Sequence, residues 1–253
     1  PRVLLRAGEA MASAGSHLEA ERFFRDAIEK SPETFHAYMG LAQLLFETDR
    51  AEQAAEVLRE AEGKVEMTAE VRRLRGQAEL KRLRPAEALD EFDRAIALDA
   101  NDLDAVFGRA MALRMLGRLD EAEGVFSQLS ERDPSYPGLA IERGRLFEAK
   151  GLTERAVEAY REALKERGED PELLLRAGAA ELLSGSLEDA ERHLLRASEA
   201  LPNNPELIHQ LGRVAMRKGD MTDALDKLSR AVAMERENGL FRTEYARALI
   251  AAG

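Results

Sequence analysis

The sequence contains no cysteine and no tryptophan, and it has only eight prolines in 253 residues. Without cysteine the chain has no disulfide framework, no thiolate nucleophile and no Cys-ligated metal site. This absence leaves the compartment unknown, and the cytoplasm is favoured only as a default. No apolar run approaches about 18 residues, the length a membrane-spanning helix needs, so we expect neither membrane insertion nor a signal peptide.

Excess positive charge is also missing. The formal net charge is −11, although 34% of the residues are charged. A chain-wide grip on nucleic acid or an anionic membrane needs clustered cationic side chains, so neither partner is expected. Abundant Ala, Leu, Glu and Arg with 5% aromatics favour an all-α fold.

Catalytic and metal-binding patterns are absent as well. None of the four histidines (His17, His36, His193 and His209) has a partner at the spacing that puts two ligands on one helix face. The glycines do not form a phosphate-binding loop, and no strand-turn-helix elbow presents a nucleophile. We therefore expect no enzyme activity, no cofactor and no metal site.

The sequence repeats with a period of 34 residues. The pentapeptide LLRAG at Leu174–Gly178 recurs at Leu4–Gly8, five periods earlier. The period runs through the chain without an insertion, which gives seven full units and one further helix: 1–34, 35–68, 69–102, 103–136, 137–170, 171–204, 205–238 and 239–253. Both ends look cut from a longer protein.

Each unit predicts a helical hairpin. Three positions of the unit hold small residues and one holds a bulky residue, as expected where two helices pack closely. Position 8 is Gly or Ala in all eight units, position 20 is always Ala, and position 27 is Ala except at Leu129. Position 24 carries Phe24, Leu58, Phe92, Phe126, Tyr160, Leu194 and Leu228.

The sequence also predicts where the helices begin and end. Position 15 is Gly in five units, with Asp49 and Leu83 as exceptions, which predicts a left-handed residue after the first helix. Asp170-Pro171 and Asn204-Pro205 place a capping side chain before a proline at the first helical position. Because no Ser/Gly-rich hinge interrupts the units, we expect one continuous domain over 1–253.

This pattern resembles the tetratricopeptide repeat family, including Pro at position 32 (Pro32, Pro134 and Pro202). It departs from the family at position 4, where Trp is frequent but absent here. The resemblance implies an all-α, right-handed superhelical solenoid of helix-turn-helix repeats. It also implies a concave face, lined by the first helices, that binds extended or helical segments of other proteins. Pentatricopeptide repeats, which bind RNA, are similar but have a period of 35 residues.

Under this resemblance the concave face takes positions 2, 5, 9, 12 and 13, which form one stripe on a helix. The stripe is apolar and mildly basic, and we expect its partner-binding centre in units 2 to 5. Some of these residues could instead pack between neighbouring first helices. The candidate residues are Met39, Phe46, Arg73, Leu80, Phe107, Met111, Arg114, Met115, Ile141 and Arg145.

Position 7 holds arginine in three successive units: Arg75, Arg109 and Arg143. They could form a basic ladder for acidic partner side chains, but we favour a structural role in which Glu79 or Glu142 neutralises them. The basic segment 71–84 is similarly interpreted as a solvated face rather than an anion site. No unit carries the Lys and Asn residues of the carboxylate clamp that holds chaperone tails.

We therefore expect a scaffold or adaptor that binds a segment of another protein in its concave groove. Phe107, Met111 and Arg114 should form the energetic centre. The alternative is a structural or self-associating spacer within a larger protein, for example in a bacterial envelope, motility or secretion assembly. Support for the alternative comes from unit 8, where Phe241, Tyr245, Leu249 and Ile250 have no second helix to cover them.

Overall fold

The structure, a computed structural model, describes all residues from Pro1 to Gly253. It contains fifteen α-helices and no β-strand, as the composition predicts. The helices fall into two compact units, Pro1–Pro134 and Ser135–Gly253, which are described separately below.

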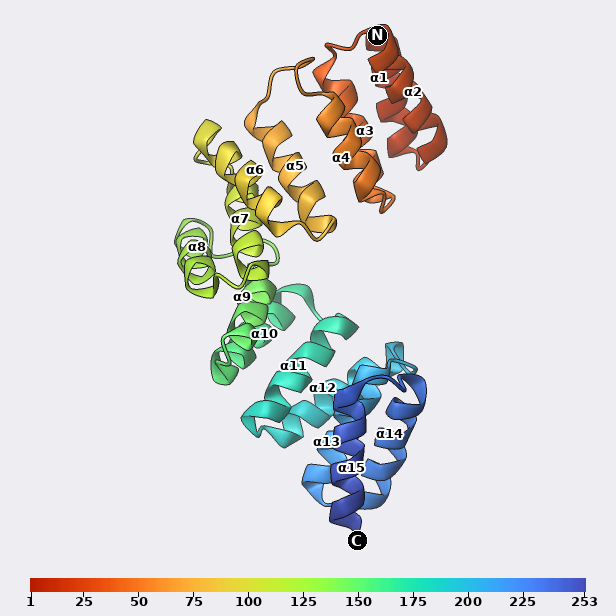
Figure 1. Cartoon of the computed structure of the whole chain (residues 1–253), viewed down its shortest axis with the longest axis vertical. Coiled ribbons are helices and arrows are strands. Elements are labelled where there is room, and N and C mark those ends of the chain that lie inside the picture. The colour runs from red at the N-terminus through yellow and green to blue at the C-terminus, as the bar shows by residue number, and fades with distance from the viewer. The chain divides into compact units, whose positions relative to one another are not determined.

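The first unit contains eight helices in four hairpins (Figure 1). Their bounds are α1 Arg2–Ser13, α2 His17–Lys30, α3 Phe35–Glu47, α4 Ala51–Glu60, α5 Ala69–Lys81, α6 Pro85–Leu98, α7 Leu103–Met115 and α8 Leu119–Arg132. Each odd-numbered helix packs against the next even-numbered helix, and α1, α3, α5 and α7 contact one another in succession. The odd-numbered helices therefore form one continuous layer.

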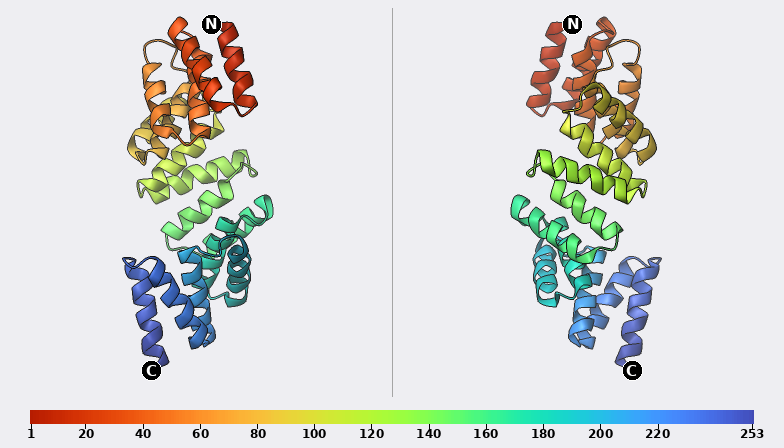
Figure 2. Two further views of the ribbon diagram at one scale, coloured as in Figure 1. Left: turned by 90° about the vertical axis from the view of Figure 1, so that its right-hand side faces the viewer. Right: turned by 90° about the vertical axis from the view of Figure 1, so that its left-hand side faces the viewer.

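The second unit contains three hairpins and a final single helix (Figure 2). Their bounds are α9 Leu139–Ala149, α10 Thr153–Arg167, α11 Pro171–Ser184, α12 Leu187–Ala200, α13 Pro205–Lys218, α14 Met221–Met234 and α15 Gly239–Ala252. Helices α11, α13 and α15 contact one another in succession. The fold is thus the predicted all-α solenoid of helical hairpins.

Small residues let the two helices of a hairpin approach closely, as the repeat positions predict. Every alanine at position 20 and every side chain at position 24 is buried. A Cβ added to Gly144 on α9 would lie 2.4 Å from Cε1 of Tyr160 on α10. A Cβ on Gly108 on α7 would lie 2.3 Å from Cζ of Phe92 on α6. The ring at position 24 therefore fills space against its own hairpin and, where the next repeat provides a glycine, against that repeat too.

The turns inside the hairpins have the predicted left-handed backbone. The five glycines at position 15 have φ between 70° and 90°. Asp49 and Leu83, which replace glycine at this position, adopt the same geometry with φ of 56° and 58°. The turn therefore requires a left-handed residue even where the sequence does not supply glycine.

The predicted helix caps are present too. Asp170 Oδ1 accepts a hydrogen bond from the Leu173 amide at 3.0 Å, and Asn204 Oδ1 accepts one from the Leu207 amide at 3.0 Å. Each cap precedes a proline in the first turn of its helix.

The expectation that unit 8 is uncovered was wrong for Phe241. This side chain on α15 is buried against Ile208 and Ala231, because α13 and α14 reach far enough to cover the first turn of α15. Ile250, at 82% exposure, and Leu249 are exposed as expected.

Candidate partner-binding surface

The candidate residues of the first unit lie on three successive odd-numbered helices: Met39 and Phe46 on α3, Arg73 and Leu80 on α5, and Phe107, Met111, Arg114 and Met115 on α7. Their positions in the 34-residue repeat put them on equivalent faces of these helices. Most are half-buried, and Met115 is 37% exposed. The layer of odd-numbered helices thus presents apolar side chains that are neither in the core nor fully in solvent.

Met39 differs from its neighbours because it is buried, with 7% exposure, in the core of α1 to α5. On α11, Leu175 at the repeat position of Met39 and Leu182 at the repeat position of Phe46 are also buried. These three side chains belong to the hydrophobic cores of their units, which is the arrangement that the alternative interpretation describes. Phe46 packs against the edge of the same core and remains half-buried.

Arg73 joins neighbouring repeats. Its guanidinium lies 3.2 Å from the Asp102 carboxylate and 3.6 Å from Asp104, both at the start of α7. Lys81, at the other end of α5, has its Nζ 6.0 Å from the centroid of the Phe46 ring. Arg73 and Lys81, two of the basic residues of this face, therefore make contacts between α5 and its neighbours α7 and α3.

Phe107, Met111 and Arg114 share one face of α7, because they are spaced four and three residues apart. The Phe107 ring meets the ring of Phe126 on α8 edge-on, with centroids 6.0 Å apart. This contact holds Phe107 in place while leaving part of the ring accessible. An aromatic, a flexible thioether and a guanidinium on one helix face can receive an apolar side chain next to a carboxylate.

The second unit carries Ile141 and Arg145 on α9, both half-buried. The Arg145 guanidinium donates to Glu142 Oε1 at 2.5 Å, while its Nε is buried without a hydrogen-bond partner. Close by, the hydroxyl of buried Tyr160 donates to Glu148 at 2.6 Å. Burial raises the pKa of both Glu148 and Tyr160, and the carboxylate raises that of Tyr160 further.

The three arginines at position 7 are structural, but the predicted partners were wrong. Arg75 pairs with Glu91 at 3.2 Å, Arg109 with Asp93 at 2.7 Å and Arg143 with Glu162 at 3.6 Å. All three acids lie on even-numbered helices, whereas Glu79 on α5 and Glu142 on α9 lie on odd-numbered helices, like the arginines. Arg75 and Arg143 thus reach the second helix of their own hairpin, whereas Arg109 reaches α6 of the preceding hairpin.

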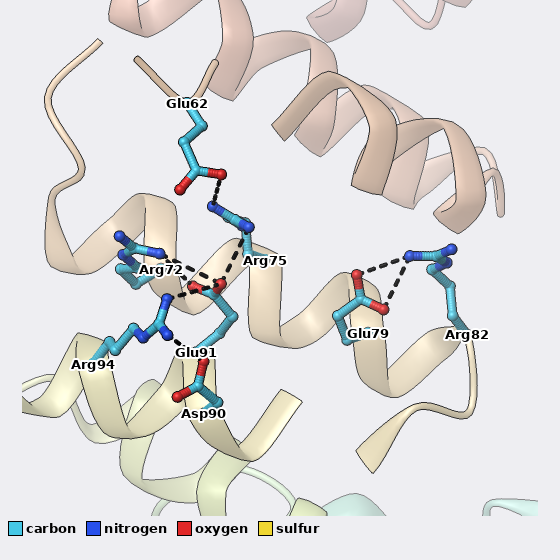
Figure 3. Close-up of polar contacts among 8 residues, drawn as sticks. All are labelled: Glu62, Arg72, Arg75, Glu79, Arg82, Asp90, Glu91 and Arg94. Atoms are coloured by element: carbon cyan, nitrogen blue, oxygen red, sulfur yellow. Dashed lines mark hydrogen bonds and ion pairs between the residues drawn. The ribbon is translucent and has the colours of Figure 1, made fainter. Parts of the chain in front are cut away.

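The basic segment 71–84 is largely neutralised by its neighbours, so it is neither an anion site nor a simple solvated face. Figure 3 shows the carboxylate of Glu91 facing Arg72, Arg75 and Arg94. Its oxygens lie 3.0 Å from Arg72 Nη1 and 3.2 Å from Arg75 Nη2. Arg82 pairs with Glu79 at 2.8 Å and with Glu52 at 2.6 Å. Glu91 is only 6% exposed, so its charge is stabilised chiefly by these arginines.

Two buried polar groups were missed by the sequence interpretation. Glu181 on α11 is fully buried and lies 2.9 Å from Arg161 Nε and 2.7 Å from His193 Nδ1. His209 on α13 is fully buried without any hydrogen bond. A contact between side chains twelve or more residues apart has no local sequence signature, which is why neither environment was predicted.

No group of three or more metal-ligating side chains comes together in the structure. None of its helices has both the length and the apolar character needed to cross a bilayer.

Comparison with known proteins identifies the repeats. Tetratricopeptide repeat family models match residues 11–78, 73–137, 141–205 and 209–253. The TPR repeat-containing protein YpiA of Bacillus subtilis (strain 168) is 32% identical over 123 residues. That match covers 45% of this chain and 29% of YpiA, so it spans less than a third of the relative.

Solved structures show the same fold. A tetratricopeptide repeat protein from Parabacteroides merdae matches 98% of each chain with a TM-score of 0.70 and 13% identity. PilW, a widely conserved type IV pilus biogenesis factor, matches 81% of this chain and 96% of its own with a TM-score of 0.73 and 19% identity. MamA from Desulfovibrio magneticus RS-1 matches 69% of this chain and 98% of its own with a TM-score of 0.61 and 21% identity. Together with the 34-residue period and the helical hairpins, the family matches show that this chain belongs to the tetratricopeptide repeat family.

Proposed function

We propose that the chain is a scaffold that binds a helical or extended segment of another protein on its layer of odd-numbered helices. Proteins of this family generally act as interaction scaffolds. The observation that supports the proposal most is the face of α7, where Phe107 and Met111 are half-buried and Met115 is exposed. Apolar surface of this kind on a water-exposed protein commonly marks a partner site.

The chemistry of this face suits an amphipathic partner. Aromatic and arginine side chains dominate the energetics of protein interfaces when they are central and desolvated. Phe107 offers an apolar contact that Phe126 already holds in place, so little conformational entropy is lost on binding. Arg114, about two turns further along α7, carries a planar guanidinium, whose shape matches that of a carboxylate.

A photocrosslinking experiment in the source cell tests this proposal. A photoreactive phenylalanine analogue replaces Met115 on α7, and a matched variant carries it at Leu18 on α2, which is 81% exposed on an even-numbered helix. We expect the analogue at position 115 to crosslink one defined segment of another protein. Equal crosslinking from both positions, or none from position 115, would show that the partner does not bind on the face of α7.

The second candidate is a self-associating spacer, and one observation favours it. Ala246, at the repeat position that is buried everywhere else, is exposed on α15, as are Leu249 and Ile250. A second copy could cover this face. Light scattering over a wide range of protein concentration separates the two functions, because a constant monomer mass is incompatible with the spacer.

A further inference from the structure

The second unit contains a pocket on the side of its even-numbered helices. It has a volume of about 270 Å³, and its lining residues come from α12, α13 and α14 and from the connection between α12 and α13. Ile208 and Leu211 form its floor, Leu195 and Leu201 form the α12 side, and Lys227 and Arg230 form the α14 side. We call it the α12–α14 pocket. It uses none of the residues assigned to the partner-binding surface above.

The same place three repeats earlier provides an internal comparison. There a pocket of about 300 Å³ is lined by residues of α6, α7 and α8 and of the connection between α6 and α7. Asp93 and Arg109 occupy the repeat positions of Leu195 and Leu211, and they form an ion pair at 2.7 Å. In the earlier repeat, two residues that line the pocket thus form an ion pair with each other. In the α12–α14 pocket the same two positions hold leucines.

Leu195 stands out among its repeat equivalents. The corresponding side chains in the other full units are all polar: Arg25, Arg59, Asp93, Ser127, Arg161 and Ser229. Leu195 is nonetheless 50% exposed, at a position where its equivalents face water. Leu195 therefore carries the apolar lining formed by Ile208 and Leu211 out to the surface of the protein, where the other full repeats have a polar residue.

The charges around the pocket indicate the sign of the partner. Its lining contains two cations, Lys227 and Arg230, and no carboxylate. Lys227 already pairs with Asp223 on its own helix, but the nearest carboxylate to Arg230, that of Asp226, lies 4.0 Å away. Arg230 is 56% exposed in its side chain, so it can meet a carboxylate from outside the chain.

An adjoining cavity of about 110 Å³ shows the opposite situation. It shares Leu195, Leu211 and Lys227 with the α12–α14 pocket and is also lined by the carboxylates of Glu191, Asp220 and Asp223. There Lys218 pairs with Glu191 at 2.7 Å, and Lys227 pairs with Asp223. The charges at that end of the groove are neutralised internally. Arg230, whose ion pair with Asp226 is long at 4.0 Å, is therefore the cation of the two cavities that is held least tightly by the chain's own carboxylates.

We propose that the α12–α14 pocket docks a segment of a second protein that inserts one large apolar side chain between Leu195 and Leu211 and places a carboxylate against Arg230. The pocket is slightly smaller than the ~300–1,000 Å³ of small-molecule sites, which suits a single side chain better than a free ligand. The scaffold thus has two binding surfaces, one on its odd-numbered helices and one between its even-numbered helices. Two such surfaces would let it hold two segments at once.

Three variants define the test. Leu195→Asp restores a polar residue at a position where the other repeats have one, so the fold should tolerate it. Arg230→Glu reverses the charge of the loosely paired cation. Leu18→Asp changes an exposed leucine on an even-numbered helix of the first unit and serves as the matched control. Circular dichroism and melting temperature establish that all three remain folded.

The probe is a phage-displayed library of random 16-residue peptides, selected on the full chain and counter-selected on the Leu195→Asp/Arg230→Glu double variant. We expect the enriched peptides to carry Leu, Ile, Met or Phe within four residues of Asp or Glu. Their affinity should fall at least about tenfold, or 1.4 kcal/mol, in each single variant and stay unchanged in Leu18→Asp.

The proposal is overturned if no peptide distinguishes the double variant from the parent, or if the enriched peptides are basic. Peptides that lose affinity in Phe107→Ala but not in Leu195→Asp belong to the surface on α7, so the two proposals fail separately. Concentration-dependent light scattering that disappears in Leu195→Asp would assign the pocket to a second copy of this chain, which also refutes docking of another protein.

Discussion

Lowering the pH should loosen the last helix of the chain, because His209 is buried in its neutral form. His209 on α13 is fully buried, and neither ring nitrogen has a hydrogen-bond partner. Its ring stacks on Phe241 of α15, with centroids 4.4 Å apart. Burial and the nearby charge of Arg213 lower the pKa of His209 to about 4, against the smaller opposite effect of Glu244.

The sign and size of the effect follow from this shift. An unfolded histidine has a pKa of about 6.5, so the folded state holds its proton more weakly than the unfolded state. The stabilisation is complete above pH 6.5 and is lost as the pH falls toward 4. Linkage gives a loss of about 2 kcal/mol between pH 7 and pH 5, and about 3 kcal/mol in full.

Hydrogen exchange of the α15 amides measures this loss, after correction for the intrinsic pH dependence of exchange. The free energy of opening α15 should fall by about 2 kcal/mol from pH 7 to pH 5 in the parent chain. It should be nearly independent of pH in His209→Leu, and unchanged from the parent in His36→Gln, which alters an exposed histidine. A His209 pKa near 6.5 by NMR, or an equal pH response in His209→Leu, would refute the reasoning.

Three further predictions concern stability. Gly144→Leu should destabilise its hairpin by about 1–3 kcal/mol and broaden the melting curve, because its Cβ would meet Tyr160 at 2.4 Å; Gly124→Ala, which meets nothing within 4 Å, should not. Leu83→Gly should raise the free energy of unfolding by about 1 kcal/mol in urea titrations, since Leu83 is left-handed and 77% exposed; a destabilised variant would contradict this. Glu91→Ala should cost about 1–3 kcal/mol by the same titrations, because half-buried Arg72 loses its carboxylate while Arg75 keeps only Glu62, and a neutral result would show that Glu91 is dispensable.

The repeat architecture could be predicted because the same few positions of every 34-residue unit hold the residue type that the helix contact or the turn requires. Position 15 demands a left-handed turn, and Gly15 and Gly117 supply it. Even the exceptions follow the rule, since Asp49 adopts the geometry that the repeat imposes. A period that persists through the whole chain averages out individual departures of this kind.

Contacts between repeats were harder to predict. Gly40 and Gly108 lie at position 6, and each makes room for the phenylalanine at position 24 of the preceding repeat. The signal is in the sequence, because glycine occurs at position 6 only after Phe24 and Phe92. Finding it requires comparison of a position with one in the next unit rather than with its own equivalents.

The irregular connection between α4 and α5 is a feature that the repeat period does not predict. Helix α4 ends at Glu60 and α5 begins at Ala69, with a left-handed Gly63 between them. The 34-residue period is preserved although the helix is short, so periodicity alone could not reveal the change. Ion-pair partners were missed for a related reason: long arginine side chains reach acids on several neighbouring helices, and sequence spacing does not choose among them.

The central claim is that a partner segment binds on the face of α7, and one affinity measurement tests it most directly. The segment crosslinked at position 115 is synthesised as a peptide, and its affinity for the parent is compared with that for Phe107→Ala/Arg114→Glu by calorimetry. We expect a loss of at least about 2 kcal/mol, roughly thirtyfold, with circular dichroism and melting temperature nearly unchanged. Unaltered affinity in the folded double variant would contradict the claim and place the binding site away from α7.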